Sequence, residues 1–218
     1  MTTQELSSRI DHTLLKADAS WSDIKNLCDE ALRFKTATVC IPPSYVKPVY
    51  EEYGHEPVMC TVIGFPLGYS VAAAKIMEAE QALISGAAEI DMVINLGDVK
   101  SGHFDAVLKE ITLLKKTCGD KILKVIVETC YLNEDEKIRL CSIVSEAGAD
   151  FIKTSTGFGS AGAALADVKL MKQHIAPAVR IKASGGIRTR SDFIAFLEAG
   201  ADRIGTSSTA KILGLDVQ

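Results

Sequence analysis

Three lysines recur at a constant spacing along the sequence. Lys124, Lys153 and Lys182 are separated by intervals of 29 residues, and each lies in a short apolar run of the kind that forms a buried strand. Burial of an unpaired ammonium group is costly and lowers the pKa of the amine, so such a lysine either pairs with a buried carboxylate or becomes a nucleophile. A nucleophilic amine forms Schiff bases with carbonyl compounds. The spacing alone leaves both explanations open.

Position within the runs separates the three lysines. Lys124 begins LKVIVETC, so we expect it near the amino end of its strand, in a structural ion pair with Glu128 or another acid. Lys153 and Lys182 lie closer to glycines, in FIKTSTG and RIKASGG, at the strand ends where barrel enzymes carry their catalytic groups. Neighbouring lysines repel, so each favours the neutral form of the other. The pair predicts a Schiff-base site, with either lysine as its nucleophile.

An aspartate is expected beside this pair. Asp91 lies in EIDMVIN, where the apolar residues have the opposite parity, and strand alternation places these apolar residues on the other face. In a closed barrel the apolar face meets the helices, so Asp91, Lys153 and Lys182 are predicted to face the interior. Asp91 can then balance positive charge and transfer protons. A plain salt bridge is the alternative.

The elements that must position these residues follow from the hydrophobic pattern. Eight apolar runs alternate with amphipathic stretches; the runs are RIDHTLL, ATVCI, VMCTVIGF, EIDMVIN, LKVIVETC, FIKTSTG, RIKASGG and RIGTSS. Helices are predicted over 21–34, 71–85, 104–116, 134–147 and 191–199, with Ser22 and Asn133 as N-cap candidates. This alternation predicts the α/β class, as a single (β/α)8 TIM-barrel domain over residues 1–218.

A weak internal repeat supports the same division. Segments 85–95, 147–157 and 199–209 align without gaps, and each contains a glycine suited to end a helix in the left-handed conformation. These glycines are Gly86, Gly148 and Gly200. The residue five positions later is Asp91, Lys153 or Gly205, so one position of the repeat carries three chemistries.

Two turns indicate a phosphate site. The last two runs continue into SGGIRT and GTSSTAKIL, glycine- and hydroxyl-rich turns that open helices, and backbone N–H groups at helix starts bind anions. In barrels the loops after strands seven and eight frequently bind a substrate phosphate. The candidates are Gly185, Gly186, Ser207 and Ser208, with Arg188 as a countercharge. Taken singly, such sequences are also ordinary turns and caps.

Composition limits the classes of partner. The formal charge is −4, with 47% hydrophobic and 24% charged residues and no block of Lys and Arg, which argues against nucleic-acid binding and favours a small-molecule substrate. The amino terminus lacks a signal-peptide pattern, and no apolar run approaches the roughly 18 residues of a membrane helix. We therefore expect a cytoplasmic protein that does not bind membranes.

The cysteines and histidines do not indicate a metal site. The six cysteines include no CxxC pair, and the four histidines show neither HxH nor HExxH spacing. We expect mostly reduced core thiols, no metal and no cofactor.

Together these motifs resemble the deoxyribose-phosphate aldolases, class I aldolases of the DeoC type. The similarity covers nearly the whole chain, through IDHTLLK, VCIPP, TVIGFPLG, EIDMVIN, LKVIVET, AGADFIKTSTGF, IKASGGIRT and RIGTSS. The resemblance implies a (β/α)8 barrel without metal or diffusible cofactor. It also implies reversible cleavage of 2-deoxy-D-ribose 5-phosphate to D-glyceraldehyde 3-phosphate and acetaldehyde, and a homodimer or homotetramer.

The resemblance also implies residue roles. Lys153 becomes the Schiff-base nucleophile, Lys182 its auxiliary lysine, Asp91 the proton-transfer group acting with a water molecule, and Asp11 an acid near the lysines and the substrate hydroxyls. The implied phosphate-binding positions are Gly157, Gly185, Gly186, Ser207 and Ser208. Cys40, in VCIPP, corresponds to a thiol near the pocket in some members, and a buried structural cysteine is the favoured role.

Two positions depart from the family pattern. Phe158 stands where some relatives carry a phosphate-binding lysine, so phosphate binding must depend more on backbone and hydroxyl groups. The chain ends in KILGLDVQ, without the terminal tyrosine that assists proton transfer in some members, which leaves the group that protonates the enamine undefined.

Two other functions compete with this interpretation. One is a different Schiff-base aldolase or a transaldolase-like barrel acting on another sugar phosphate, which the use of acetaldehyde as donor would distinguish. The other is a catalytically silent sugar-phosphate-binding barrel. The presence of Lys153, Lys182, Asp91 and Asp11 argues against the silent barrel.

Overall fold

Eight parallel strands form a closed barrel in the computed structural model, which describes residues 1–215. Each strand pairs with its sequence neighbours, and β8 closes onto β1. The strands are β1 (Ile10–Thr13), β2 (Thr38–Ile41), β3 (Met59–Ile63), β4 (Glu89–Val93), β5 (Ile122–Ile126), β6 (Phe151–Lys153), β7 (Arg180–Ser184) and β8 (Arg203–Thr206). The predicted α/β class and (β/α)8 architecture are confirmed.

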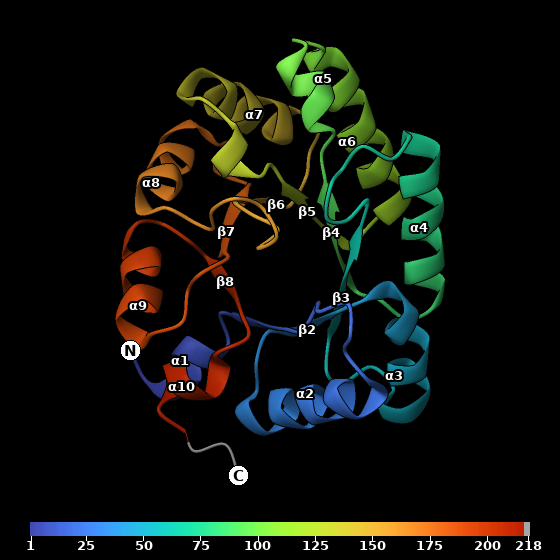
Figure 1. Cartoon of the computed structure of the whole chain (residues 1–218), viewed down its shortest axis with the longest axis vertical. Coiled ribbons are helices and arrows are strands. Elements are labelled where there is room, and N and C mark those ends of the chain that lie inside the picture. Colours follow the sequence, from blue (N-terminus) through green and yellow to red (C-terminus); the bar gives the residue numbers. More distant parts are fainter. Residues whose placement is uncertain (216–218) are drawn as a thin grey trace.

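Helices surround the barrel as an outer ring (Figure 1). They are α1 (Thr3–Ser7), α2 (Trp21–Phe34), α3 (Val46–Tyr53), α4 (Ala72–Ile84), α5 (Leu96–Lys100), α6 (Phe104–Cys118), α7 (Glu134–Glu146), α8 (Leu165–His174), α9 (Arg190–Glu198) and α10 (Thr209–Leu213). Short 3-10 turns cover Pro43–Tyr45 and Thr129–Tyr131. The five predicted helices correspond to α2, α4, α6, α7 and α9, with ends within two residues of the predicted ones.

One predicted helix cap is wrong. Ser20, not Ser22, is the N-cap of α2, because its hydroxyl accepts the backbone N–H of Asp23 while the Asp23 side chain accepts the N–H of Ser20. The prediction for α7 is confirmed, since Asn133 and Glu136 form the reciprocal capping box. Such caps satisfy N–H groups that lack partners within the helix.

Strand alternation gives the barrel wall two different faces. Apolar side chains of β4, β6 and β7 such as Ile90, Ile152 and Ile181 are fully buried in the core cluster that also includes helix residues. The residues of opposite parity form the charged interior, where Lys153 is in register with Lys182 and Asp91 is in register with Lys124. The predicted facing is confirmed.

Several expectations fall outside what the structure tests. Residues 216–218, the end of KILGLDVQ, lie outside the described residues, and the single domain over 1–218 stays a prediction. No helix within residues 1–215 combines the length and apolar character needed to cross a bilayer. All six cysteines are free, and five of them are buried.

Candidate active site

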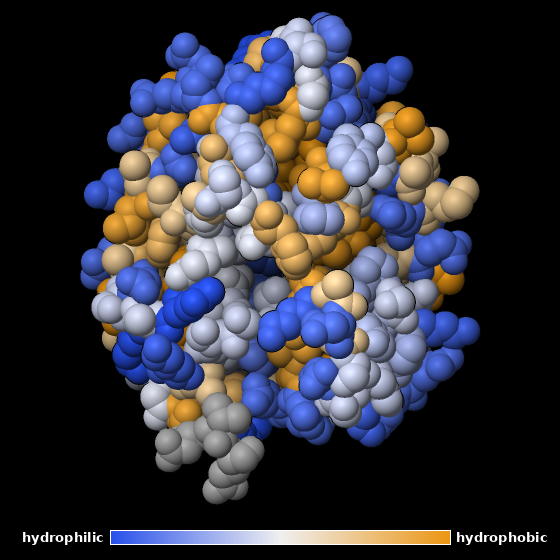
Figure 2. Space-filling model, in the orientation of Figure 1, coloured by the Kyte–Doolittle hydropathy of each residue, from blue (hydrophilic) through white to orange (hydrophobic). Residues whose placement is uncertain are grey.

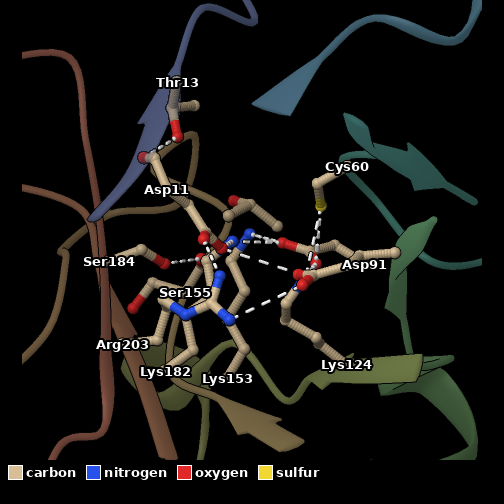
Figure 3. Close-up of polar contacts among 12 residues, drawn as sticks. Asp11, Thr13, Cys60, Asp91, Lys124, Lys153, Ser155, Lys182, Ser184 and Arg203 are labelled. Atoms are coloured by element: carbon tan, nitrogen blue, oxygen red, sulfur yellow. Dashed lines mark hydrogen bonds and ion pairs between the residues drawn. The ribbon is translucent and has the colours of Figure 1, made fainter. Parts of the chain in front are cut away.

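Asp91 lies at the centre of a charged cluster inside the barrel (Figure 3). Its Oδ2 atom is 2.7 Å from the Nζ atom of Lys153 and 2.7 Å from that of Lys182. Its Oδ1 atom is 2.7 Å from the Nζ atom of Lys124. One carboxylate from β4 therefore accepts hydrogen bonds from lysines on three successive strands, β5, β6 and β7.

Two further carboxylates complete the cluster. Asp11, on β1, contacts Lys182 Nζ at 2.5 Å through Oδ2 and Arg203 at 2.5 Å through Oδ1. Glu89, on β4, lies 2.6 Å from Lys124 Nζ and 3.5 Å from Arg203. Buried charges persist in proteins when they are paired and hydrogen-bonded in this way.

Mutual attraction fixes the charge of most members. Burial by itself raises the pKa of Asp91, but Lys124, Lys153 and Lys182 outweigh it and hold that pKa well below its ordinary value. Burial lowers the pKa of Lys182, yet Asp11 and Asp91 outweigh it, so the pKa is raised. The same balance, led by Asp91 on the raising side, raises the pKa of Lys124. Asp91 is therefore an anion and both Lys124 and Lys182 are cations at neutral pH.

The cluster holds more cationic side chains than carboxylates. Lys124, Lys153, Lys182 and Arg203 share the three carboxylates of Asp11, Glu89 and Asp91. The charges balance when one cationic group is neutral. Lys153 contacts a single carboxylate, whereas each of the other three contacts at least two.

The predicted ion pair of Lys124 with an acid is confirmed. The acids are Glu89 and Asp91, while Glu128, the acid named first in the prediction, binds Thr156 instead. Lys182 is in register with Lys153, and two carboxylates contact it.

Two thiols border the same cluster. Cys60 donates to Asp91 Oδ1 at 3.1 Å and accepts from Lys124 Nζ at 3.2 Å. Burial raises the pKa of Cys60 well above its ordinary value. Cys40 is the register partner of Cys60 and is fully buried, consistent with a structural cysteine. Asp11, Cys60 and Glu89 come close enough to bind a metal ion, but the Lys124 ammonium group contacts all three.

A pocket opens at the carboxyl ends of the strands, and the face in Figure 2 is hollowed near its centre. Among the described residues of the charged cluster, only Lys153, the last residue of β6, lines the pocket. Asp91, Lys182 and Asp11 do not line the pocket. Asp91 accepts hydrogen bonds from Lys153 and Lys182, and Asp11 contacts Lys182. Lys153 thus meets the pocket, while the carboxylates and the lysine that support it lie behind the pocket wall.

Most predicted phosphate residues lie in this pocket. The lining includes Gly157, Gly185, Gly186, Arg188 and Ser207. Ser208 follows Ser207 in the sequence but does not line the pocket, and its role in phosphate binding stays a prediction.

The pocket walls come from different loops that touch each other. Gly157 and Gly185 have positive φ angles of 87° and 88°, which favour glycine. A Cβ atom on Gly185 would lie only 2.9 Å from the Cα atom of Gly162. Phe158 lines the same pocket, and its ring contacts Phe65 edge-on with centroids 5.3 Å apart.

Sequence reasoning missed several residues of the site. Glu89 and Arg203 share the interior parity of Asp91 and Gly205 on their strands, so alternation could have identified them. Lys16, in the quoted IDHTLLK, lines the pocket and brings a second exposed cation beside Arg188. Cys60 gave no signal in the sequence, because its role depends on contacts across three strands.

Comparison with known proteins places the chain among aldolases. The sequence model of the DeoC/LacD family aldolases matches residues 7–213. A deoxyribose-phosphate aldolase of Clostridioides difficile is 57% identical over 94% of this chain and 93% of the relative. Another, of Clostridium botulinum, is 54% identical over 98% and 96%.

A solved structure agrees with these relatives. The tetrameric deoxyribose phosphate aldolase from Aeropyrum pernix superposes with a TM-score of 0.88 at 35% identity, covering 98% of this chain and 91% of that one. The fold, the buried lysine cluster and the nearly full-length matches agree, and the chain belongs to the DeoC/LacD family of aldolases.

Proposed function

We propose that this protein is a class I aldolase that reversibly cleaves 2-deoxy-D-ribose 5-phosphate to D-glyceraldehyde 3-phosphate and acetaldehyde. The observation that carries the proposal is the placement of Lys153 on the pocket lining, 2.7 Å from an Asp91 that Lys124 and Lys182 also contact. Two relatives that match this chain over nearly their whole length are named deoxyribose-phosphate aldolase. The pocket supports binding of a small sugar phosphate.

The reaction starts with the amine of Lys153. In its neutral form the amine attacks the carbonyl carbon of the open-chain sugar, and the carbinolamine loses water to give a protonated imine. The imine withdraws electrons from the C2–C3 bond, which breaks as the C3 hydroxyl group loses its proton. Asp91, acting through a water molecule, takes up that proton. Glyceraldehyde 3-phosphate leaves, and the remaining enamine is protonated and hydrolysed to acetaldehyde and free Lys153.

The buried partners keep Lys153 ready for attack. Lys182 is held as a cation by Asp11 and Asp91, and it shares Oδ2 of Asp91 with Lys153. Asp11 contacts the ammonium group of Lys182 and does not line the pocket. Because the charges of the cluster balance when one amine is neutral, loss of the proton from Lys153 does not leave an unpaired carboxylate.

The phosphate group is assigned to the other side of the pocket. Gly157, Gly185, Gly186 and Ser207 line the pocket and offer backbone and hydroxyl donors, and Ser208 is the next residue in the sequence. Arg188 and Lys16 line the same pocket as countercharges, which compensates for Phe158 in place of a cation.

Product formation tests this function directly. Purified protein incubated with 2-deoxy-D-ribose 5-phosphate is expected to release equal amounts of acetaldehyde and glyceraldehyde 3-phosphate, measured by separate coupled assays. Mixing the two products is expected to regenerate the sugar phosphate. Condensation with a different donor but not with acetaldehyde would contradict the substrate assignment.

We further propose that the protein is a homodimer or homotetramer that acts in the cytoplasm. The tetrameric relative from Aeropyrum pernix supports assembly, and α4 exposes Met77 and Ile84, which are 65% and 79% accessible. Sedimentation velocity at micromolar concentration tests the proposal, which a monomer alone would contradict.

A further inference from the structure

A buried carboxylate that the proposed reaction does not use anchors the loop between β6 and α8. Glu128 is 2% exposed and lies two residues beyond the end of β5. Its two carboxylate oxygens each accept the backbone N–H of Thr156 at 3.2 Å, and the Thr156 hydroxyl group donates to Oε2. Both donors of Thr156 therefore bind a single side chain.

The backbone at Glu128 is held in an uncommon conformation. Its φ and ψ angles of 53° and 67° are left-handed, a region that residues other than glycine seldom adopt. Among the described residues only Lys35, at the end of α2, shares a positive φ without being glycine. The N–H group of Val127 donates to the backbone carbonyl oxygen of Lys153 at 3.0 Å, and that of Thr129 donates to the backbone carbonyl oxygen of Thr154 at 2.9 Å. The chain thus pairs with β6 on both sides of Glu128.

Thr156 transmits this anchorage to the pocket. Its hydroxyl oxygen accepts the backbone N–H of Phe158 at 3.0 Å, which closes a tight turn around Gly157. Gly157 and Phe158 both line the pocket. A Cβ atom on Gly185 would lie 3.5 Å from the Cα atom of Gly157. The position of Thr156 therefore sets the distance between Gly157 and Gly185, two phosphate-binding candidates that follow different strands.

The loop also passes directly against the carboxylate. A Cβ atom on Gly159 would lie 3.1 Å from the Cδ atom of Glu128 and 2.9 Å from the Sγ atom of Cys130. Further on, Ala163 N–H donates to the carbonyl oxygens of Ser184 and Gly185 at 3.0 and 3.1 Å. The loop is thus attached to β5 at one end, through Glu128, and to β7 at the other.

We propose that Glu128 is a positioning residue that shapes the phosphate-binding side of the pocket without touching the substrate. This inference rests on the proposed function, because it assigns the substrate's phosphate group to the turn at Gly157. An unpaired carboxylate near the phosphate group would repel that group. The carboxylate of Glu128 is instead hydrogen-bonded by the N–H and hydroxyl groups of Thr156, and it does not line the pocket. The expected consequence is that Glu128 controls phosphate affinity and leaves the chemistry at Lys153 unchanged.

Four variants test this role. Glu128→Gln places an amide group against the donors of Thr156, and Thr156→Val removes the hydroxyl group. Thr156→Ser keeps both donors. Glu136→Gln is the matched control, since Glu136 also accepts a backbone N–H but does so in the cap of α7. Steady-state kinetics with 2-deoxyribose 5-phosphate and with unphosphorylated 2-deoxyribose, and line broadening of inorganic phosphate in 31P NMR, are measured for each full-length protein.

The expected result is a split between binding and chemistry. Glu128→Gln and Thr156→Val raise the KM for the phosphorylated sugar and the Kd for inorganic phosphate by about tenfold, the effect of one buried group left without its hydrogen bond. kcat, and kcat/KM for unphosphorylated 2-deoxyribose, change by less than about twofold, well below the tenfold that a lost hydrogen bond gives. Thr156→Ser and Glu136→Gln behave as wild type.

Other results overturn the inference. Equal losses with both sugars indicate general damage, and unchanged phosphate binding in Glu128→Gln shows that the anchor does not shape the site. If wild type cleaves neither sugar, the proposed function fails, and the phosphate titration alone decides the role of Glu128. Wild type that binds no phosphate contradicts both proposals. If Glu128→Gln does not fold, as judged by thermal denaturation, the comparison of Thr156→Val with Thr156→Ser decides.

Discussion

At the residue scale, the proposed chemistry depends on how the carboxylate of Asp91 is shared. Lys124 and Lys182 each contact a second carboxylate, whereas Lys153 contacts Asp91 alone. Lys153 is also the lysine that lines the pocket. The residue best placed to meet a carbonyl group is therefore the one with the fewest ionic contacts.

Replacement of Asp91 is expected to reduce turnover strongly. Asp91→Asn removes the anion that orients Lys153 and takes part in proton transfer, so kcat for sugar-phosphate cleavage falls by about 10²- to 10⁴-fold, the usual contribution of a general acid–base. Asp167→Asn is the control, because Asp167 pairs with Lys137 at 2.6 Å away from the pocket. Initial rates at saturating substrate give the comparison. Equal activity of the two variants would contradict the role of Asp91.

At the scale of elements, parity along the strands was enough to predict which charges face the interior. The 29-residue spacing of the lysines and the apolar residues around Asp91 fixed their faces, because side chains alternate along a strand. Parity could not decide between Glu89 and Glu128 as a partner of Lys124. Glu128 follows the same strand, but its left-handed backbone directs its carboxylate to Thr156 in the next loop. Loop conformation of this kind depends on contacts between distant segments.

Close packing of the β6–α8 loop on β7 gives a prediction for this element. A Cβ atom on Gly162 would lie 2.2 Å from the carbonyl oxygen of Gly185. Gly162→Ala must therefore displace the loop, and it is expected to lower the free energy of unfolding by about 1–3 kcal/mol, the usual cost of overpacking. Urea denaturation measures this value. Ser160→Ala, at an exposed position of the same loop, is expected to unfold like wild type, and equal midpoints for both variants would refute the packing argument.

At the scale of the whole molecule, the charged cluster connects strands that are far apart in the sequence. Asp11, on the first strand, contacts Lys182 and Arg203 on the last two strands, while Asp91 contacts Lys124 and Lys153. Ion pairs thus link β1 to β7 and β8, and β4 to β5 and β6. The cluster that prepares Lys153 also contributes to closing the barrel.

The pH dependence of stability follows from this cluster. The pKa values of Asp11 and Asp91 are lowered in the folded protein, so their contribution is complete above the unfolded value of about 4 and is lost as the pH falls further. The pKa values of Lys124 and Lys182 are raised, so their contribution is complete below about pH 10 and is lost as the pH rises through their folded values.

Asp11→Asn isolates the acid side of this dependence. Loss of one partner from buried ion pairs is expected to cost about 3–5 kcal/mol at pH 7. The difference from wild type shrinks as the pH falls below about 4, because the Asp11 carboxylate of unfolded wild type then takes up a proton while that of the folded protein, with its lowered pKa, stays ionised. Urea unfolding between pH 3 and pH 9 tests this, with Asp120→Asn, at an exposed position, as control. A constant difference between Asp11→Asn and wild type over this range would contradict the expectation.

The identity of the lysine that forms the Schiff base tests the central claim most directly. The protein is treated with borohydride in the presence of acetaldehyde or 2-deoxyribose 5-phosphate, and the modified peptide is identified by mass spectrometry. Lys153 lines the pocket while Lys182 and Lys124 are enclosed behind it, so the reduced adduct is expected on Lys153 alone. An adduct on Lys182 alone, or on no lysine, would contradict the account.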